Sequence, residues 1–165
     1  MSDVSIFSRI RTTFVEPIGQ NQLRARCILT DTLTEAAVEV SIRAPELEIV
    51  DVKAKITRAP LKPQEDETQL ARKIIGVRLG PGMKKIIRGL IGEADETKQL
   101  AFMIEECCNA VILSLTKEVL LQKPQDKRAE KDFYRNIVKQ NMRLYNRCAA
   151  FAPGSSLLEG IEPPA

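Results

Sequence analysis

A short glycine-rich turn carries the residues with the clearest capacity for chemistry. It reads Gly80-Pro81-Gly82, and Lys84 and Lys85 follow in the first turn of a predicted helix. The first amides of a helix have no partner inside the helix and lie at the positive end of its dipole. Such amides, joined by two ammonium groups, can hold an anion. We therefore expect a ligand-binding site at residues 80–85, to which Arg78 just before the turn is added as a candidate.

The spacing of this turn differs from that of the familiar phosphate-binding loops. It follows neither the Gly-x-x-x-x-Gly-Lys-Ser/Thr order nor the Gly-x-Gly-x-x-Gly order. We expect Gly80 to precede the helix and Pro81 to be its first residue, since the missing proline amide costs nothing there. Gly92 is placed to end the helix. The alternative interpretation is a tight connection into a short core helix with solvated lysines.

The chain contains no histidine and four cysteines. Without histidine, Ser–His and Cys–His catalysis and histidine-ligated zinc are excluded. Cys107 and Cys108 are adjacent in a predicted helix, where neighbouring side chains diverge by about 100° and make a poor chelate. We interpret them as core residues. The alternative is a metal or redox site formed by Cys107, Cys108 and Cys148, and no cofactor is otherwise predicted.

A length of 165 residues suits one domain with a proper core. We expect a single domain over residues 1–151 and a flexible tail over residues 152–165. No apolar run reaches membrane-spanning length, and the first residues lack the pattern of a signal peptide. Because the cysteine spacing does not suggest a disulfide framework, we predict reduced thiols and a cytoplasmic location.

The formal net charge is only +3, but the charged residues are unevenly distributed. Residues 61–92 and residues 126–148 each contain seven basic and three acidic side chains, whereas residues 93–125 contain six acidic and three basic ones. This alternation fits basic surfaces that flank an acidic helix and argues against a chain built around nucleic acid. We expect an anionic small molecule or an acidic protein as the partner, and no membrane. The charge distribution leaves the oligomeric state open.

Apolar and polar residues alternate with period two between residues 6 and 58, which predicts four antiparallel strands. Turn residues separate these strands at 17–21, 31–32 and 44–46. In the first strand, we expect Ile10 and Phe14 to face the core. The opposite, solvated face is expected to carry mainly basic side chains: Arg9, Arg11, Arg24, Arg26, Arg43, Lys53 and Lys55, with Glu39 and Asp51 among them.

Helical periodicity dominates residues 65–151. We expect a long central helix from about residue 95 to about residue 121, with Glu105, Glu106 and Glu118 facing outward. A last helix is expected from residue 126 to about residue 151. Basic residues at every fourth position of this last segment predict either a solvated face or a ridge that meets an acidic surface: Lys131, Arg135, Lys139, Arg143 and Arg147.

The order of a meander, the run Gly76-Val77-Arg78-Leu79-Gly80-Pro81-Gly82 and a leucine-rich helix resembles a bacterial family of unknown function (domain of unknown function number 2889). The resemblance covers roughly residues 8–150. Members carry a Gly-Cys-Thr-His-Leu box and then an acidic residue at the start of the long helix. Here Glu96-Thr97-Lys98-Gln99-Leu100 and Phe102 stand at those positions. Gln99, in place of the histidine, is therefore added to the ligand-binding candidates, and a thiol or metal role of the box is not expected.

The succession of strands and then helices is also similar, in element order alone, to iron–sulfur scaffold proteins of the NifU-like type. Together these features predict an α+β fold, with an antiparallel meander of about four strands packed on one face by about four helices. The expected function is that of a non-catalytic accessory protein that holds an anionic ligand or an acidic partner at the glycine turn. The alternatives are a degenerate iron–sulfur or metal scaffold and a small enzyme that uses a lysine or a carboxylate.

Overall fold

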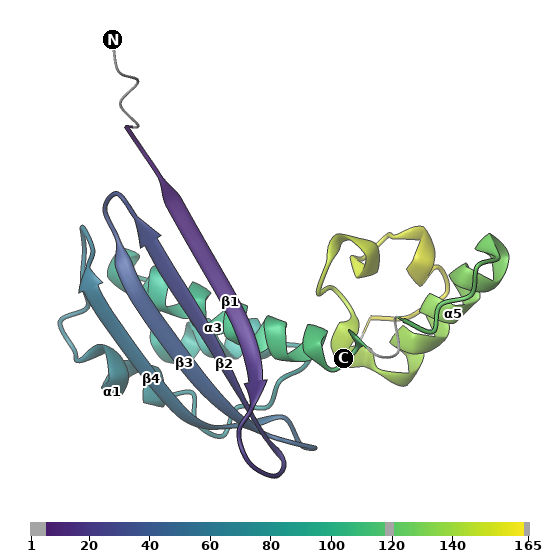
Figure 1. The fold of residues 1–165 in the computed structure, drawn as a ribbon, viewed down its shortest axis with the longest axis horizontal. Coiled ribbons are helices and arrows are strands. Elements are labelled where there is room, and N and C mark those ends of the chain that lie inside the picture. Colours follow the sequence, from purple (N-terminus) through teal and green to yellow (C-terminus); the bar gives the residue numbers. More distant parts are fainter. Residues whose placement is uncertain (1–5, 118–120, 164–165) are drawn as a thin grey trace.

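A computed structural model of the chain describes residues 6–117 and 121–163. A four-stranded antiparallel sheet forms one layer, and helices lie on one of its faces (Figure 1). The α+β architecture predicted from the sequence is thereby confirmed. Within the described ranges, no helix combines the length and the apolar character that crossing a bilayer requires.

The sheet consists of β1 (Arg9–Pro17), β2 (Gln22–Asp31), β3 (Glu35–Arg43) and β4 (Glu48–Arg58). Consecutive strands pair in the order β1-β2-β3-β4, so β1 and β4 form the two edges. The three turns fall where the sequence predicts them. In the first, Asn21 adopts a left-handed φ of 59°, which asparagine tolerates better than most residues.

The first strand presents the opposite faces from those predicted. Its register places Arg11 beside Leu29, which is buried. Because paired residues of antiparallel strands share a face, Arg9 and Arg11 lie on the helix side, whereas Ile10 and Phe14 face away from it. The prediction failed because β1 is an edge strand whose faces are set by the stronger apolar alternation of β2, not by its own weaker pattern.

Three helices build the core against the sheet. α3 (Asp95–Ser114) lies across β1, β2 and β3, α1 (Glu67–Arg72) packs on β4, and α2 (Met83–Ile91) packs on α3. Figure 1 shows α3 running behind the strands. The side chains between these layers are almost all aliphatic, so hydrophobic burial fixes the position of α2, whose start carries the candidate site.

α3 differs from its prediction at two points. Glu105 is buried instead of facing outward, with a relative exposure of 4%, because it pairs with Arg88 across the α2–α3 interface. Glu106 is half-buried, and Glu118 lies outside the described residues. α3 also ends at Ser114 and not near residue 121. The hydroxyls of Ser114 and Thr116 donate to carbonyls three residues earlier, and such local bonds compete with helix continuation.

The C-terminal part forms a smaller unit beside the sheet (Figure 1). α5 (Lys127–Gln140) is capped by Asp126, where the sequence predicts the last helix to start, but it ends about ten residues early. 3₁₀ turns follow at Met142–Leu144, Ala149–Phe151 and Ser156–Leu158. Asn141 ends the helix with non-helical angles of φ −138° and ψ 76°. The last turn buries Leu158 to 5% exposure near α5. The predicted continuous basic ridge is therefore broken into separate contacts.

Candidate functional site

The start of α2 is built around Gly82. This residue has a left-handed φ of 79° and precedes the helix without any side-chain cap. Our prediction that Gly80 precedes the helix and that Pro81 is its first residue was wrong by two positions. The left-handed geometry requires glycine, and the Met83 amide closes the turn by donating to the Gly80 carbonyl at 3.3 Å.

The first turn of α2 offers unused donors and cations. Among the described residues, the amides of Lys84 and Lys85 have no hydrogen-bond acceptor, and neither ammonium group forms an ion pair. The first turn contains no acidic residue. The positive end of the helix dipole is therefore reinforced by two lysines instead of being neutralised.

A third cation reaches this turn from the C-terminal unit. The guanidinium of Arg147 donates to the Gly80 carbonyl through Nη2, to Asn109 Oδ1 at 3.2 Å and to the Arg143 carbonyl at 3.1 Å. All three acceptors are neutral. Burial lowers the pKa of Arg147, against the attraction of Cys108 and Glu105. Arg147 is thus a half-buried cation that forms no ion pair within the described chain.

These groups surround one cavity of about 450 Å³ between α2 and the C-terminal unit. No carboxylate is among its described lining residues: Pro81, Gly82, Lys84, Lys85, Tyr145, Asn146, Arg147 and Pro163. The volume is within the usual range for small-molecule sites. Sequence reasoning placed Arg147 in a helical ridge and so missed its approach to the turn. Its only signal was its membership of that basic run.

Two further candidates lie elsewhere. Arg78 forms an isolated bridge with Glu48 and an ion pair with it at 3.6 Å, and it lines a separate shallow cavity with Arg43. Gln99 is half-buried in the second turn of α3 and does not line the cavity at the start of α2. The structure therefore brings together Gly80, Gly82 and the two lysines, but not Arg78 or Gln99.

The three candidate metal ligands, Cys107, Cys108 and Cys148, do not gather at one site. Cys107 and Cys108 are fully buried, and the Cys107 thiol points to the Val38 carbonyl at a sulfur–oxygen distance of 3.8 Å. Burial raises the pKa of the Cys108 thiol to about 12 and that of Cys107 still further above its ordinary value. Cys148 is exposed in the C-terminal unit. Over residues 6–117 and 121–163, no group of three or more potential ligands could hold a metal ion. Buried thiols with raised pKa values are poor ligands and poor nucleophiles.

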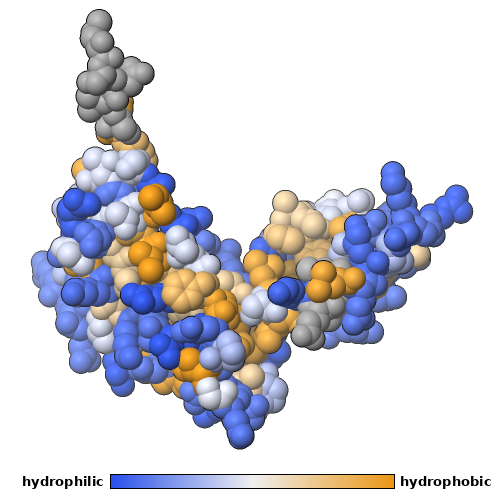
Figure 2. All heavy atoms as spheres, viewed as in Figure 1, coloured by the Kyte–Doolittle hydropathy of each residue, from blue (hydrophilic) through white to orange (hydrophobic). Residues whose placement is uncertain are grey.

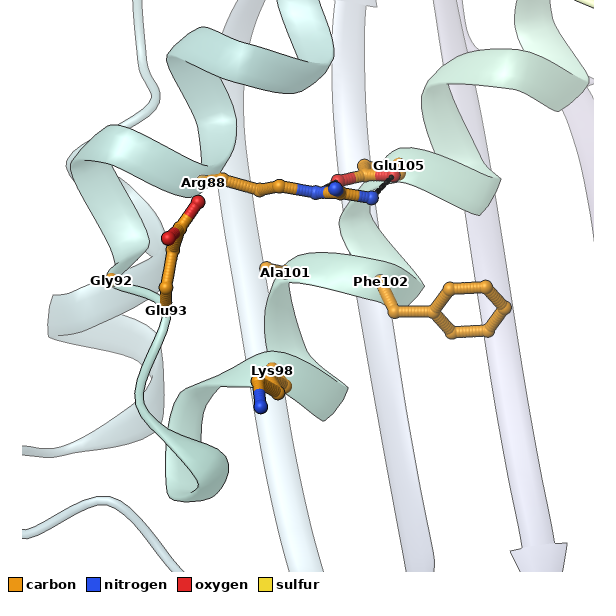
Figure 3. Close-up of a pocket in the computed structure, with 7 residues that line it drawn as sticks. All are labelled: Arg88, Gly92, Glu93, Lys98, Ala101, Phe102 and Glu105. Carbon is orange, nitrogen blue, oxygen red and sulfur yellow. Dashed lines mark hydrogen bonds and ion pairs between the residues drawn. The ribbon is translucent and has the colours of Figure 1, made fainter.

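A second cavity, of about 440 Å³, lies between α2 and α3. There the Arg88 guanidinium donates to both Glu105 oxygens, at 2.7 and 3.2 Å. Figure 3 shows this pair between the two helices, with Lys98 and Phe102 at the cavity wall. The hydrogen bonds to Glu105 raise the pKa of Arg88, and Glu105 has a side-chain exposure of only 5%. The cavity thus contains a cation that is already neutralised.

Comparisons of the chain with family models, with curated proteins and with solved structures give no match. The resemblances to the family of unknown function and to NifU-like scaffolds therefore stay predictions.

Proposed function

We propose that this protein is a non-catalytic binding protein that holds an anionic small molecule in the cavity at the start of α2. One observation carries the proposal. Two free helix amides, two unpaired ammonium groups and the Arg147 guanidinium converge on a cavity of about 450 Å³ that no described carboxylate lines. Cations gathered without a counter-charge repel one another, so a bound anion would relieve a standing cost.

The donor set favours a phosphoryl group. Its oxygens accept several hydrogen bonds at once, which suits amides at a helix start, and a lysine binds it as a point charge. Arg147 uses three of its five N–H groups within the protein, so one N–H on Nη1 and one on Nη2 remain for the same anion or for a second one. Tyr145 adds a hydroxyl and a ring to the wall. An anion with two charged groups, such as a diphosphate, matches these donors better than a single carboxylate does.

We also propose the cytoplasm as the compartment. Support comes from the four cysteines, all of which are unpaired thiols in the structure. In extracellular proteins cysteines are commonly oxidised to disulfides, whereas the cytoplasm keeps them reduced.

The test uses inorganic pyrophosphate as the probe and thermal unfolding as the readout. Pyrophosphate at about 100 times its dissociation constant stabilises the native state by about 2.7 kcal/mol, so we expect the melting temperature to rise by roughly 5–10 °C. Sodium chloride at equal ionic strength separates specific binding from screening. In Lys84→Gln/Lys85→Gln we expect this rise to disappear.

The matched control is Lys127→Gln/Arg128→Gln. Lys127 and Arg128 occupy the first turn of α5, whose start is already capped by Asp126. Their substitution removes the same charge as the double-lysine variant does. The control should respond to pyrophosphate as the unmodified protein does. A melting temperature that pyrophosphate leaves unchanged, or an equal loss in both variants, would overturn the proposal. An acidic peptide of glutamates, tested in parallel, separates a small-molecule site from a surface for an acidic partner.

A further inference from the structure

The outer edge of β1 carries a row of backbone groups without a strand partner among the described residues. Which groups these are follows from the bonds that bracket the β1–β2 ladder. Thr32 N donates to Ser8 O, and Ile18 N donates to Gln22 O. Because hydrogen-bonded pairs alternate along an antiparallel ladder, the even-numbered residues of β1 face β2. The amides and carbonyls of Arg9, Arg11, Thr13 and Val15 therefore point to the open edge.

Natural edge strands usually carry charges, prolines or bulges that prevent pairing with another chain. In β1 such features are either missing or engaged in other contacts. Its pairing with β2 is regular from Arg9 to Pro17, without a bulge, and the only proline is the last residue. The Arg9 guanidinium is held by Asp31 at 2.8 Å on the helix side. The Arg11 guanidinium is held there by Glu106 at 3.4 Å. Neither charge guards the open edge.

Apolar side chains on the same strand face solvent. Ile10 is 68% exposed and Phe14 is 39% exposed, both on the face turned away from α3. Figure 2, which looks onto this face, shows apolar residues running along it. Large apolar groups beside an unpaired edge are typical of a strand that is covered by another strand.

We propose that β1 pairs with β1 of a second copy of this chain, antiparallel and centred on Thr12, so that two four-stranded sheets join into one. In this register Arg9 exchanges hydrogen bonds with Val15 of the other copy, and Arg11 exchanges them with Thr13. All of these residues carry the free edge groups. On the outer face, Ile10 lies beside Phe14 of the other copy, at the close spacing of a pair without backbone bonds.

Charge and backbone chemistry exclude the neighbouring registers. Pairing centred on Ile10 or on Arg11 places Arg9 opposite Arg11, or Arg11 opposite itself, and like charges directly opposite one another destabilise a sheet. Pairing centred on Thr13 sets Ile10 against Glu16 and uses Pro17, which has no amide to donate. Among these registers, only the one centred on Thr12 pairs the exposed Ile10 with the exposed Phe14 and avoids opposed arginines.

The experiment is disulfide trapping in a Cys148→Ser background, which removes the exposed native thiol. Thr12→Cys places one thiol from each copy side by side at the two-fold axis, within reach of a disulfide. The matched control, Thr30→Cys, introduces the same change at an exposed position of the same sheet face on β2, where both β1 strands separate it from its counterpart. Under mild oxidation we expect a covalent dimer from the first variant and none from the second.

Light scattering at about 100 μM supplies an independent readout. The unmodified chain should have twice the monomer mass. Phe14→Lys should convert it to a monomer, because the lysine replaces the aromatic partner of Ile10, whereas Leu61→Lys, at a 60% exposed site outside the sheet, should leave the dimer intact. A monomeric unmodified chain, a dimer that persists in Phe14→Lys, or equal trapping at both cysteine positions would overturn the proposal.

Discussion

The two cavities that border α2 have nearly the same volume, about 440 and 450 Å³, and each contains an arginine and at least one lysine. They differ in counter-charge. In the cavity between α2 and α3, the buried Glu105 carboxylate accepts two hydrogen bonds from the Arg88 guanidinium. In the cavity at the start of α2, the described hydrogen-bond acceptors of Arg147 are all carbonyl or amide oxygens.

This difference separates a structural ion pair from a candidate binding site. A cation that is already paired gains little from an external anion and loses its partner if the anion displaces it. A cation with neutral acceptors keeps its long-range attraction for an anion. The comparison therefore predicts opposite signs for substitutions. Removing a charge from the paired cavity should destabilise the fold, whereas removing charges from the unpaired cavity should cost binding but not stability.

The largest expected effect comes from Arg88→Met, which leaves the Glu105 carboxylate buried without its partner. Breaking one side of a buried pair is normally strongly destabilising, but Arg88 is itself half-exposed, so the effect is reduced. We expect the melting temperature to fall by roughly 5 °C in thermal unfolding followed by circular dichroism.

The double variant Arg88→Met/Glu105→Met controls for lost packing. Replacing both partners by apolar groups leaves no unsatisfied charge and is often close to neutral. The double variant should therefore be more stable than Arg88→Met alone. If the second substitution lowers the melting temperature further, the pair is not the stabilising unit and the contrast between the cavities fails.

A second neutralised pair, Arg9 with Asp31, tests the same idea through pH. Burial alone would raise the pKa of Asp31, but hydrogen bonds from Arg9 and from the amides of Leu33 and Thr34 hold that pKa below its usual range. A carboxyl group with a lowered native pKa stabilises the fold above its unfolded pKa of about 3.9 and loses that contribution as the pH falls further.

Asp31→Asn should therefore lower the melting temperature by roughly 3 °C at pH 7, and this deficit should shrink progressively as the pH falls below about 3.9. The charge-matched control is Asp132→Asn, because Asp132 is a 71% exposed carboxylate in a surface pair with Arg135. Such pairs contribute little, so this variant should follow the unmodified protein at every pH. A deficit of equal size at pH 7 and pH 3 would show that Asp31 acts through the geometry of its turn and not through its charge.

The sequence predicted what depends on local pattern. Alternation and turn residues located all four strands, and the start of the last helix was predicted within one residue of where α5 begins. The sequence-based prediction failed where the facing or burial of a residue depends on another element of the fold. The facing of Phe14 depends on the register with β2, and the burial of Glu105 depends on an arginine 17 residues earlier on another helix.

The residues of the candidate site likewise separate into those that local sequence predicts and those that tertiary contacts place. Its glycine turn and its two lysines are consecutive in the chain, so spacing and helix physics were sufficient to select them. Arg147 reaches the Gly80 carbonyl from 67 residues away, through a break after α5 that helical periodicity did not predict. Arg78 was selected only because it is close in sequence, and its ion pair with Glu48 directs it elsewhere.

The smallest expected effect is the most direct test of the comparison, because it has the opposite sign. In the absence of any anion, Lys84→Gln/Lys85→Gln removes two cations from the positive end of α2, where each is unfavourable by about 0.3–1 kcal/mol at low ionic strength. We expect the melting temperature to rise by roughly 1–3 °C in low salt and the rise to fade in about 0.5 M sodium chloride.

Lys139→Gln, in the last turn of α5, removes a cation from a negative helix end and should instead lower the melting temperature slightly. A decrease in the double-lysine variant would mean that these lysines already have partners within the protein, and the cavity at the start of α2 would then resemble the one that Glu105 neutralises.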